Sequence, residues 1–152
     1  MQKNLITKLE NYKPLNQHED VTEFVQLVRE AVQTGETRYI PILLSFFSDE
    51  SDFPDVMQYL LTELEEYSPK KYIPILMNSF QPMLVEAPQW LVTIVIRILN
   101  NATCLKLLEE NLPHVPKKPF LQLLQLISQE SPYHKKTCTV LKKKILKVSI
   151  HH

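Results

Sequence analysis

The pentapeptide Tyr-Ile-Pro-Ile-Leu occurs twice in this chain, at Tyr39–Leu43 and at Tyr72–Leu76. A five-residue match that includes a proline rarely recurs by chance in a sequence of 152 residues. The starting positions define a period of about 33 residues, and fixed periods of roughly 20 to 50 residues are typical of folds that stack repeated units. Such folds present an extended surface to a partner. The duplicated pentapeptide therefore predicts a repeat architecture and a binding role.

The composition favours helices over strands. The chain has 11 prolines but a single glycine, Gly35. Tight β-hairpins depend on glycine, whereas helices joined by proline-marked turns do not. Nucleotide-binding loops and the nucleophile elbow of hydrolases each require several glycines, so both are excluded. We therefore expect an all-α protein.

Apolar residues recur at helical spacing in three pairs of segments. Pro54, Pro88 and Pro119 are predicted to open the second helix of each pair, where a missing N–H has no helical partner to lose. The spacing of these prolines stays close to that of the two pentapeptides, so the period persists where the sequence itself diverges. The predicted pairs cover residues 37–67, 69–100 and 102–129. Their helices are expected at residues 37–47 and 54–67, at 69–81 and 87–100, and at 102–112 and 118–129.

Three further helices are predicted outside the pairs, at residues 3–12, 20–34 and 133–148. The second has Asp20 as a candidate N-cap and Gly35 as a candidate C-cap. We expect residues 1–150 to form one helical-repeat domain, long enough to bury a substantial core.

Pro41 and Pro74 fall within the predicted first helices, and proline bends a helix at an interior position. A bent first helix followed by a straight second helix resembles the HEAT repeat family over roughly residues 20–130. Helix-pair length and period support the same resemblance. It implies a short right-handed α-solenoid of HEAT-like helix pairs with flanking terminal helices.

Nothing in the sequence suggests catalysis or a cofactor. The five histidines are scattered, and Cys104 and Cys138 have no metal-ligand spacing, so two small buried residues of a reducing compartment are expected. No apolar leader follows Met1, and the apolar runs are short. We expect a non-catalytic cytoplasmic protein with no bound cofactor or metal.

The net charge is zero but unevenly distributed. Residues 1–115 hold 9 basic and 16 acidic side chains, a balance of −7, and residues 116–152 hold 8 and 1, a balance of +7. Between Tyr39 and Pro69 there are seven acids and no lysine or arginine. The acids are Asp49, Glu50, Asp52, Asp55, Glu63, Glu65 and Glu66.

The helix predicted at residues 54–67 separates apolar from acidic residues. A buried stripe is expected at Val56, Leu60, Leu61 and Leu64, with an acidic face opposite. Such a face either keeps the protein soluble or binds a basic partner, and uncompensated like charge favours the partner. Trp90 serves as an anchor or equally as a core residue. The predicted partner-binding residues are Asp49, Glu50, Asp52, Asp55, Tyr59, Glu63, Glu66, Trp90 and Arg97.

A compact, non-catalytic helical repeat with an acidic face is similar to the immunity proteins of bacterial polymorphic and contact-dependent growth inhibition toxin systems. Several of those families have HEAT-like folds. The resemblance implies a cytoplasmic antitoxin, monomeric alone, that binds a basic toxin, such as a nuclease, at 1:1 and neutralises it. Asp52, Asp55, Glu63 and Glu66 would then pair with the toxin's basic side chains.

Two other functions stay open at this stage. One is a HEAT-type scaffold or adaptor in a larger complex. The other is nucleic-acid binding by the lysine-rich helix at residues 133–148, although the polar outer face of a capping helix explains those lysines more simply.

Overall fold

Prolines and short polar turns divide the chain into ten α-helices, and the computed structural model, which describes residues 2–148, contains no strand within that range. The all-α prediction is therefore confirmed. The first five helices are α1 (Gln2–Glu10), α2 (Thr22–Gln33), α3 (Ile40–Leu44), α4 (Pro54–Leu64) and α5 (Pro69–Asn78). The others are α6 (Phe80–Glu86), α7 (Pro88–Leu99), α8 (Ala102–Glu110), α9 (Lys117–Glu130) and α10 (Lys135–Val148).

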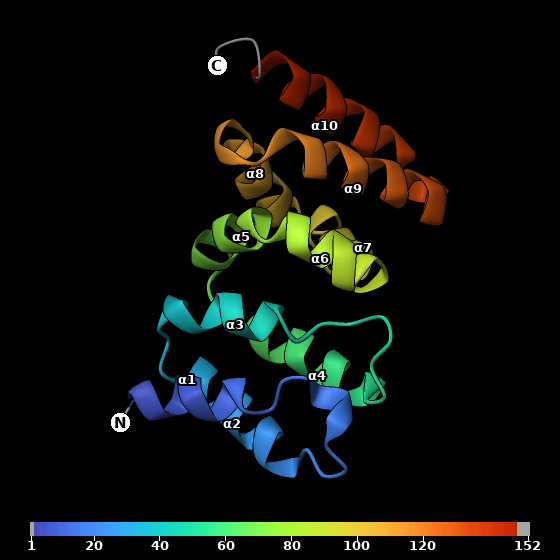
Figure 1. Cartoon of the computed structure of the whole chain (residues 1–152). Helices are drawn as coiled ribbons and strands as arrows, with labels where there is room; N and C mark the ends of the chain where they lie inside the picture. Colours follow the sequence, from blue (N-terminus) through green and yellow to red (C-terminus); the bar gives the residue numbers. More distant parts are fainter. Residues whose placement is uncertain (1, 149–152) are drawn as a thin grey trace.

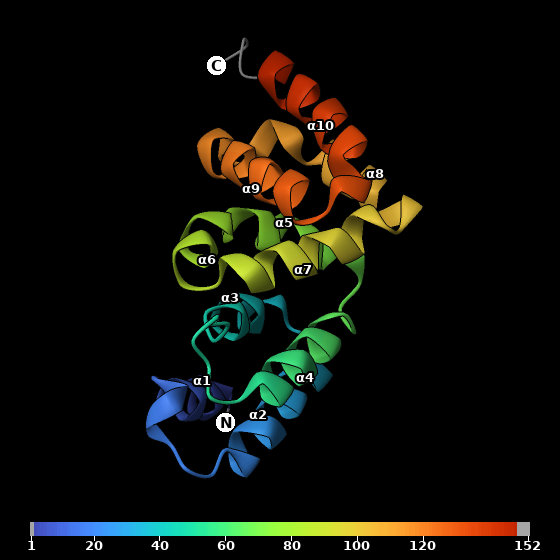
Figure 2. The same ribbon diagram turned by 90° about the vertical axis from the view of Figure 1, so that its right-hand side faces the viewer.

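The helices lie in successive layers that follow the order of the chain, from α1 and α2 at one end to α9 and α10 at the other (Figure 1). Viewed from the side, α1, α3, α6 and α9 form one column, and α2, α4 and α7 lie along the opposite side (Figure 2). Neighbouring layers pack through α3 against α5 and through α6 against α9. Helices near in sequence are thus also near in space.

A continuous hydrophobic core runs between the two columns. Phe24 of α2 contacts Phe46 with ring centroids 4.6 Å apart, and Phe80 of α6 stacks on Phe120 of α9 at 6.1 Å. Burying aromatic rings contributes more apolar area per residue than any other side-chain type. These ring pairs hold adjacent layers together.

Glycine and proline act at the helix ends largely as predicted. Pro54 and Pro88 are the first residues of α4 and α7. Pro119 is the third residue of α9. Gly35 follows α2 with a φ of 72°, a backbone conformation that is unfavourable for residues other than glycine. The carboxylate of Asp20 accepts a hydrogen bond from the Thr22 N–H at 2.9 Å, just before α2.

The segment predicted as one helix at residues 69–81 is two helices, α5 and α6. The break falls at Ser79 because Pro82 has no N–H to donate to the carbonyl of Asn78, four residues earlier. Residues 82–86, expected to be a connection, continue α6 instead. The first helix of the first pair is also shorter than predicted, a 3₁₀ turn at Thr37–Tyr39 followed by α3. The expected domain end at residue 150 lies outside the described residues.

Candidate partner-binding surface

Asp49 lies in the loop between α3 and α4 but caps a helix about 40 residues further along the chain. Its carboxylate accepts hydrogen bonds from the N–H groups of Gln89 at 2.8 Å and Trp90 at 3.2 Å, in the first turn of α7. Its own N–H donates to the carbonyl of Glu86 at 3.3 Å. A negative charge at a helix N-terminus satisfies unpaired N–H groups and complements the helix dipole. Asp49 therefore has a structural role that sequence patterns did not reveal.

The same loop is held from the other side by Asn16. The Asn16 Nδ2 donates to the carbonyl of Glu50 at 2.9 Å, and the Asp52 N–H donates to Asn16 Oδ1 at 2.8 Å. The side chains of Glu50 and Asp52 stay exposed. Two carboxylates thus project from a backbone that is fixed at both ends.

The exposed side of α4 carries the residues expected there, with one exception. Asp55 and Thr62 are exposed and Tyr59 between them is half-buried, and Glu66 is exposed in the turn just beyond the helix. A helix turns about 100° per residue, which places Asp55, Tyr59 and Thr62 along one line. Helix α2 packs beside α4 and adds exposed carboxylates. We define the acidic surface as Glu23, Glu30, Glu50, Asp52, Asp55 and Glu66.

The exception is Glu63, which was predicted on the exposed face but is only 7% exposed. Its Oε2 lies 3.9 Å from Nη1 of Arg29, on the neighbouring helix α2. The buried arc of α4 includes Met57 and extends over Glu63 because α2 covers that flank. Glu63 is therefore an internal ion-pair partner and does not contribute an open carboxylate.

Arg97 of α7 pairs with Glu65, just beyond the end of α4. The Arg97 Nε and Nη2 donate to the two Glu65 oxygens at 2.6 and 2.8 Å, a bidentate geometry. The hydrogen bonds and the charge of Glu65 raise the pKa of Arg97 above its already high value. The acidic run is thus partly neutralised on the side that faces α7.

Trp90 was predicted as either an interface anchor or a core residue, and it is half-buried. Its ring lies against Phe47 with centroids 5.8 Å apart. Because its backbone N–H is bonded to Asp49, the indole is held at the start of α7.

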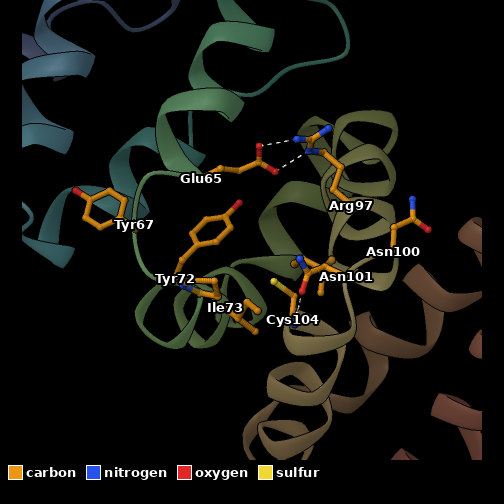
Figure 3. A pocket seen from close by; sticks show the side chains of 10 residues that line it. Glu65, Tyr67, Tyr72, Ile73, Arg97, Asn100, Asn101 and Cys104 are labelled. Carbon is orange, nitrogen blue, oxygen red and sulfur yellow. Dashed lines mark hydrogen bonds and ion pairs between the residues drawn. The ribbon is translucent and has the colours of Figure 1, made fainter.

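A cleft of about 470 Å³ opens beside the Glu65–Arg97 pair, between the end of α4, α5, α7 and the start of α8 (Figure 3). Its lining combines apolar groups such as Ile73 with the polar side chains of Tyr72, Asn100 and Asn101. Cys104 also lines it, and burial, aided by the charge of Glu65, raises the pKa of its thiol. A thiol kept protonated is a poor nucleophile, so Cys104 does not supply this cleft with an activated nucleophile.

Tyr72 is buried in this cleft, with 5% of its surface exposed, and its hydroxyl points toward the Glu65–Arg97 pair (Figure 3). Among the buried side-chain atoms that the structure describes, this hydroxyl is the one without a hydrogen-bond partner. Burial raises the pKa of Tyr72 strongly, so its hydroxyl remains a neutral donor. Sequence reasoning missed this cleft, and the repeated pentapeptide was the single available signal for Tyr72.

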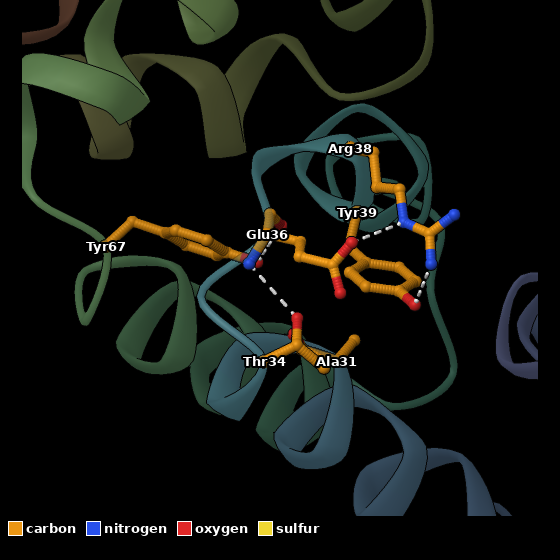
Figure 4. Close-up of polar contacts among 6 residues, drawn as sticks. All are labelled: Ala31, Thr34, Glu36, Arg38, Tyr39 and Tyr67. Atoms are coloured by element: carbon orange, nitrogen blue, oxygen red, sulfur yellow. Dashed lines mark hydrogen bonds and ion pairs between the residues drawn. The ribbon is translucent and has the colours of Figure 1, made fainter. Parts of the chain in front are cut away.

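The equivalent tyrosine in the first pentapeptide is satisfied (Figure 4). The Arg38 Nη2 donates to the Tyr39 hydroxyl at 3.0 Å, and the guanidinium carbon lies 4.9 Å from the ring centroid. Nearby, the Tyr67 hydroxyl donates to the carbonyl of Glu36 at 2.8 Å. The first copy is thus closed by its neighbours, whereas the second borders an open cleft.

A comparison with protein-family models matches residues 11–108 to immunity protein 30, which is 98 of the 152 residues. The chain belongs to the immunity protein 30 family. Membership implies that the protein neutralises a toxin, and such proteins act by binding, which confirms the non-catalytic prediction. Neither the curated proteins nor the solved structures contain a match to the chain.

The region matched to the immunity family contains both features described above. The acidic surface and every residue of the Tyr72 cleft lie between residues 11 and 108. Helices α9 and α10 lie beyond the match.

Residues of these two helices and of the turn that joins them line a groove of larger volume, about 640 Å³. Its rim carries four lysines, Lys117, Lys118, Lys135 and Lys142. In this immunity-family protein, α9 and α10 lie at the opposite end of the stack from α2, which contributes to the acidic surface (Figure 1).

Other candidate sites are few in this immunity-family protein. Within residues 2–148 no group of three or more His, Cys, Asp or Glu side chains has the arrangement of a metal site. No single helix in that range is long and apolar enough to cross a membrane, although α7 and α8, joined at a bend of 108°, pass that test together.

Proposed function

We propose that this protein binds a basic toxin through its acidic surface and neutralises it by occlusion. The single observation that carries the proposal is the set of exposed carboxylates on α2, in the loop before α4, on α4 and in the turn after it. Glu63 and Glu65 are excluded from this role because Arg29 and Arg97 already pair with them.

The distribution of charge along the chain also supports binding of the toxin at the acidic surface. The −7 balance of residues 1–115 belongs to the part of the chain that holds α1–α8 and their connections, and half of its acids lie in those connections. The +7 balance of residues 116–152 lies in α9 and α10, at the far end of the molecule from α1 and α2 (Figure 1). Charge separated in this way orients a basic partner during its approach and raises the association rate. The basic end would repel such a partner, so docking is directed to α2 and α4.

Tyr59 and Trp90 are the proposed anchors of the interface. Each is half-buried, so each side chain is held in place by the core and still offers part of its ring to a partner. Aromatic side chains of this kind carry much of the binding energy at protein interfaces, where they lose little conformational freedom. The surrounding carboxylates then supply orientation and specificity.

The biological setting is part of the proposal. The proposed fold is a HEAT-like right-handed α-solenoid, and the layered order of the helices supports it. Such a solenoid would present α2, α4 and α7 as one extended surface (Figure 2). We propose a cytoplasmic protein, monomeric alone, that forms a 1:1 complex with a toxin of a polymorphic or contact-dependent growth inhibition system, such as a nuclease.

The test is to recover the toxin by pull-down from the source cell, then to measure its affinity by calorimetry at about 0.05 M and about 0.3 M salt. The triple variant Glu30→Lys, Asp55→Lys, Glu66→Lys should weaken binding by at least about 100-fold and reduce its salt dependence. The matched control is Lys136→Glu, Lys142→Glu, Lys143→Glu on α10, which should not weaken binding. Undiminished affinity of the first variant would exclude the acidic surface.

A further inference from the structure

The Tyr72 cleft contains a buried hydroxyl that has no partner within the fold. Burying a hydroxyl without a hydrogen bond costs roughly the strength of one to a few hydrogen bonds, and native proteins seldom retain such a group. Tyr72 as a whole is 5% exposed, and its hydroxyl oxygen is buried. The residue lines a cleft of about 470 Å³ that opens to the surface, so the buried hydroxyl lies beside a space large enough for a side chain or a short piece of backbone.

The polar groups around this space are mainly hydrogen-bond donors. Asn101 Oδ1 already accepts from the Cys104 N–H at 3.0 Å, which leaves its Nδ2 as a donor. Asn100 Oδ1 is bonded to His134 Nε2 at 2.7 Å, which likewise leaves Nδ2. Both oxygens of Glu65 accept from Arg97, whose Nη1 remains available. With Tyr72, these four residues come from α5, α7 and the turn between α7 and α8, and all of them line one cleft.

The position of the cleft connects it to the proposed interface. Glu65 borders it and is adjacent in sequence to Glu66, which belongs to the acidic surface. Arg97 lies on the exposed side of α7, two turns after Trp90. A partner that covers α4 and α7 would therefore reach the mouth of the cleft.

We propose that this cleft receives an oxygen acceptor from a loop of the toxin, either a carboxylate or a peptide carbonyl, which accepts a hydrogen bond from Tyr72. The inference rests on the proposed function for the identity of the partner. The Glu65–Arg97 pair closes one side of the cleft and holds Arg97 in position to donate as well. The unbonded hydroxyl is then a preformed part of the interface.

The first experiment compares Tyr72→Phe with Tyr39→Phe, the same residue in the two copies of one pentapeptide. Tyr72→Phe should weaken toxin binding roughly 5- to 50-fold, the effect of one buried hydrogen bond. It should leave the melting temperature of the free protein unchanged or raised, because no internal bond is lost. Tyr39→Phe loses the bond from Arg38, so it should lower the melting temperature by about 3 °C and leave affinity within about 2-fold.

The second experiment tests the cleft without the toxin. Acetate and N-methylacetamide are titrated into the protein while the side-chain amide of Asn101 is followed by NMR. We expect saturable shifts with one of the probes in the wild type and none in Tyr72→Phe. Stronger binding of acetate identifies a carboxylate as the natural group, and stronger binding of N-methylacetamide identifies a peptide carbonyl.

Two results would overturn the inference. One is a Tyr72→Phe variant that binds the toxin as well as the wild type, whatever its melting temperature. A melting temperature several degrees lower would add that the hydroxyl is satisfied in the free protein by water. The other is the absence of saturable shifts with either probe. Failure of the wild type to bind any toxin would refute the proposed function instead, and the titration would still decide whether the cleft accepts an oxygen ligand.

Discussion

The two copies of Tyr-Ile-Pro-Ile-Leu have the same sequence but different surroundings. In the first, Tyr39 follows a 3₁₀ turn, and Arg38 bonds its hydroxyl and covers its ring. In the second, Tyr72 already lies inside α5, the preceding residue is the exposed Lys71, and the hydroxyl has no partner. The aliphatic residues of both copies are mostly buried in the core. The two copies therefore share their buried aliphatic packing, whereas the hydroxyl groups of their tyrosines have different surroundings.

The prediction with the largest expected effect tests whether the buried residues of the two copies contribute equally to stability. Leu43 and Leu76, the last residues of the two copies, are both fully buried. Replacing either with Ala should lower the free energy of unfolding by about 3 kcal/mol, through lost burial and a residual cavity. Urea unfolding of the two variants gives the comparison directly. Because the cost of such a replacement depends on how far each site can collapse, clearly unequal losses would show that the copies are not equivalent in packing.

The second prediction concerns the turns before the two copies, which require different backbone conformations. Gly35 and Ser68 occupy equivalent positions, at the same distance before the tyrosine of each copy. Gly35 has a φ of 72° and open space where a Cβ would lie, so Gly35→Ala should cost about 1–2 kcal/mol from backbone strain alone. Ser68 makes no capping bond through its side chain, so Ser68→Ala should cost less than about 0.5 kcal/mol. Equal costs in thermal unfolding would contradict this asymmetry.

Alkaline pH should lower the free energy of unfolding through Tyr67, which lies near the first copy. The Tyr67 hydroxyl donates a hydrogen bond to the Glu36 carbonyl. Burial raises the pKa of Tyr67 from its ordinary 10.0 to about 12. The neutral form is favoured in the folded state, so this contribution is complete below pH 10 and is lost as pH rises toward 12. The free energy of unfolding should fall by about 1 kcal/mol at about pH 11 from this group.

The control variants for that titration are Tyr67→Phe and Tyr133→Phe. Tyr67→Phe should lose less stability than the wild type between neutral pH and about pH 11, as measured by urea unfolding. Tyr133 is 91% exposed, so Tyr133→Phe should follow the wild-type profile. Identical profiles for Tyr67→Phe and the wild type would refute the assigned role.

The last prediction concerns Asp49, in the loop after the first copy, whose carboxylate caps α7, beyond the second copy. Asp49→Ala removes the cap of α7 and should lower the free energy of unfolding by about 1 kcal/mol. Toxin affinity should change far less than in Asp55→Lys, because the Asp49 carboxylate is occupied within the fold. A large loss of toxin affinity without a loss of stability in Asp49→Ala would show that Asp49 contacts the toxin, as predicted from the sequence.

Much of the fold was predictable because its determinants are local. Proline positions and the 3.6-residue apolar period located nearly every helix, and the duplicated pentapeptide indicated successive, similar units. The errors were local as well: Pro82 divides one predicted helix in two at Ser79, and Pro41 lies in a helix of only five residues. The separation of acidic and basic ends was also readable from the sequence, because layers follow chain order (Figure 1).

Tertiary structure alone decided which of the predicted site residues are available to a partner. The helical period determines the direction of Glu63 on α4, but only the packing of α2 buries it beside Arg29. Asp49 meets α7 about 40 residues away, and Glu65 meets Arg97 across 32 residues. The Tyr72 cleft likewise exists only where α4, α5, α7 and α8 converge. Local sequence determines what each side chain is and which way it points, whereas the neighbouring helices determine what it touches.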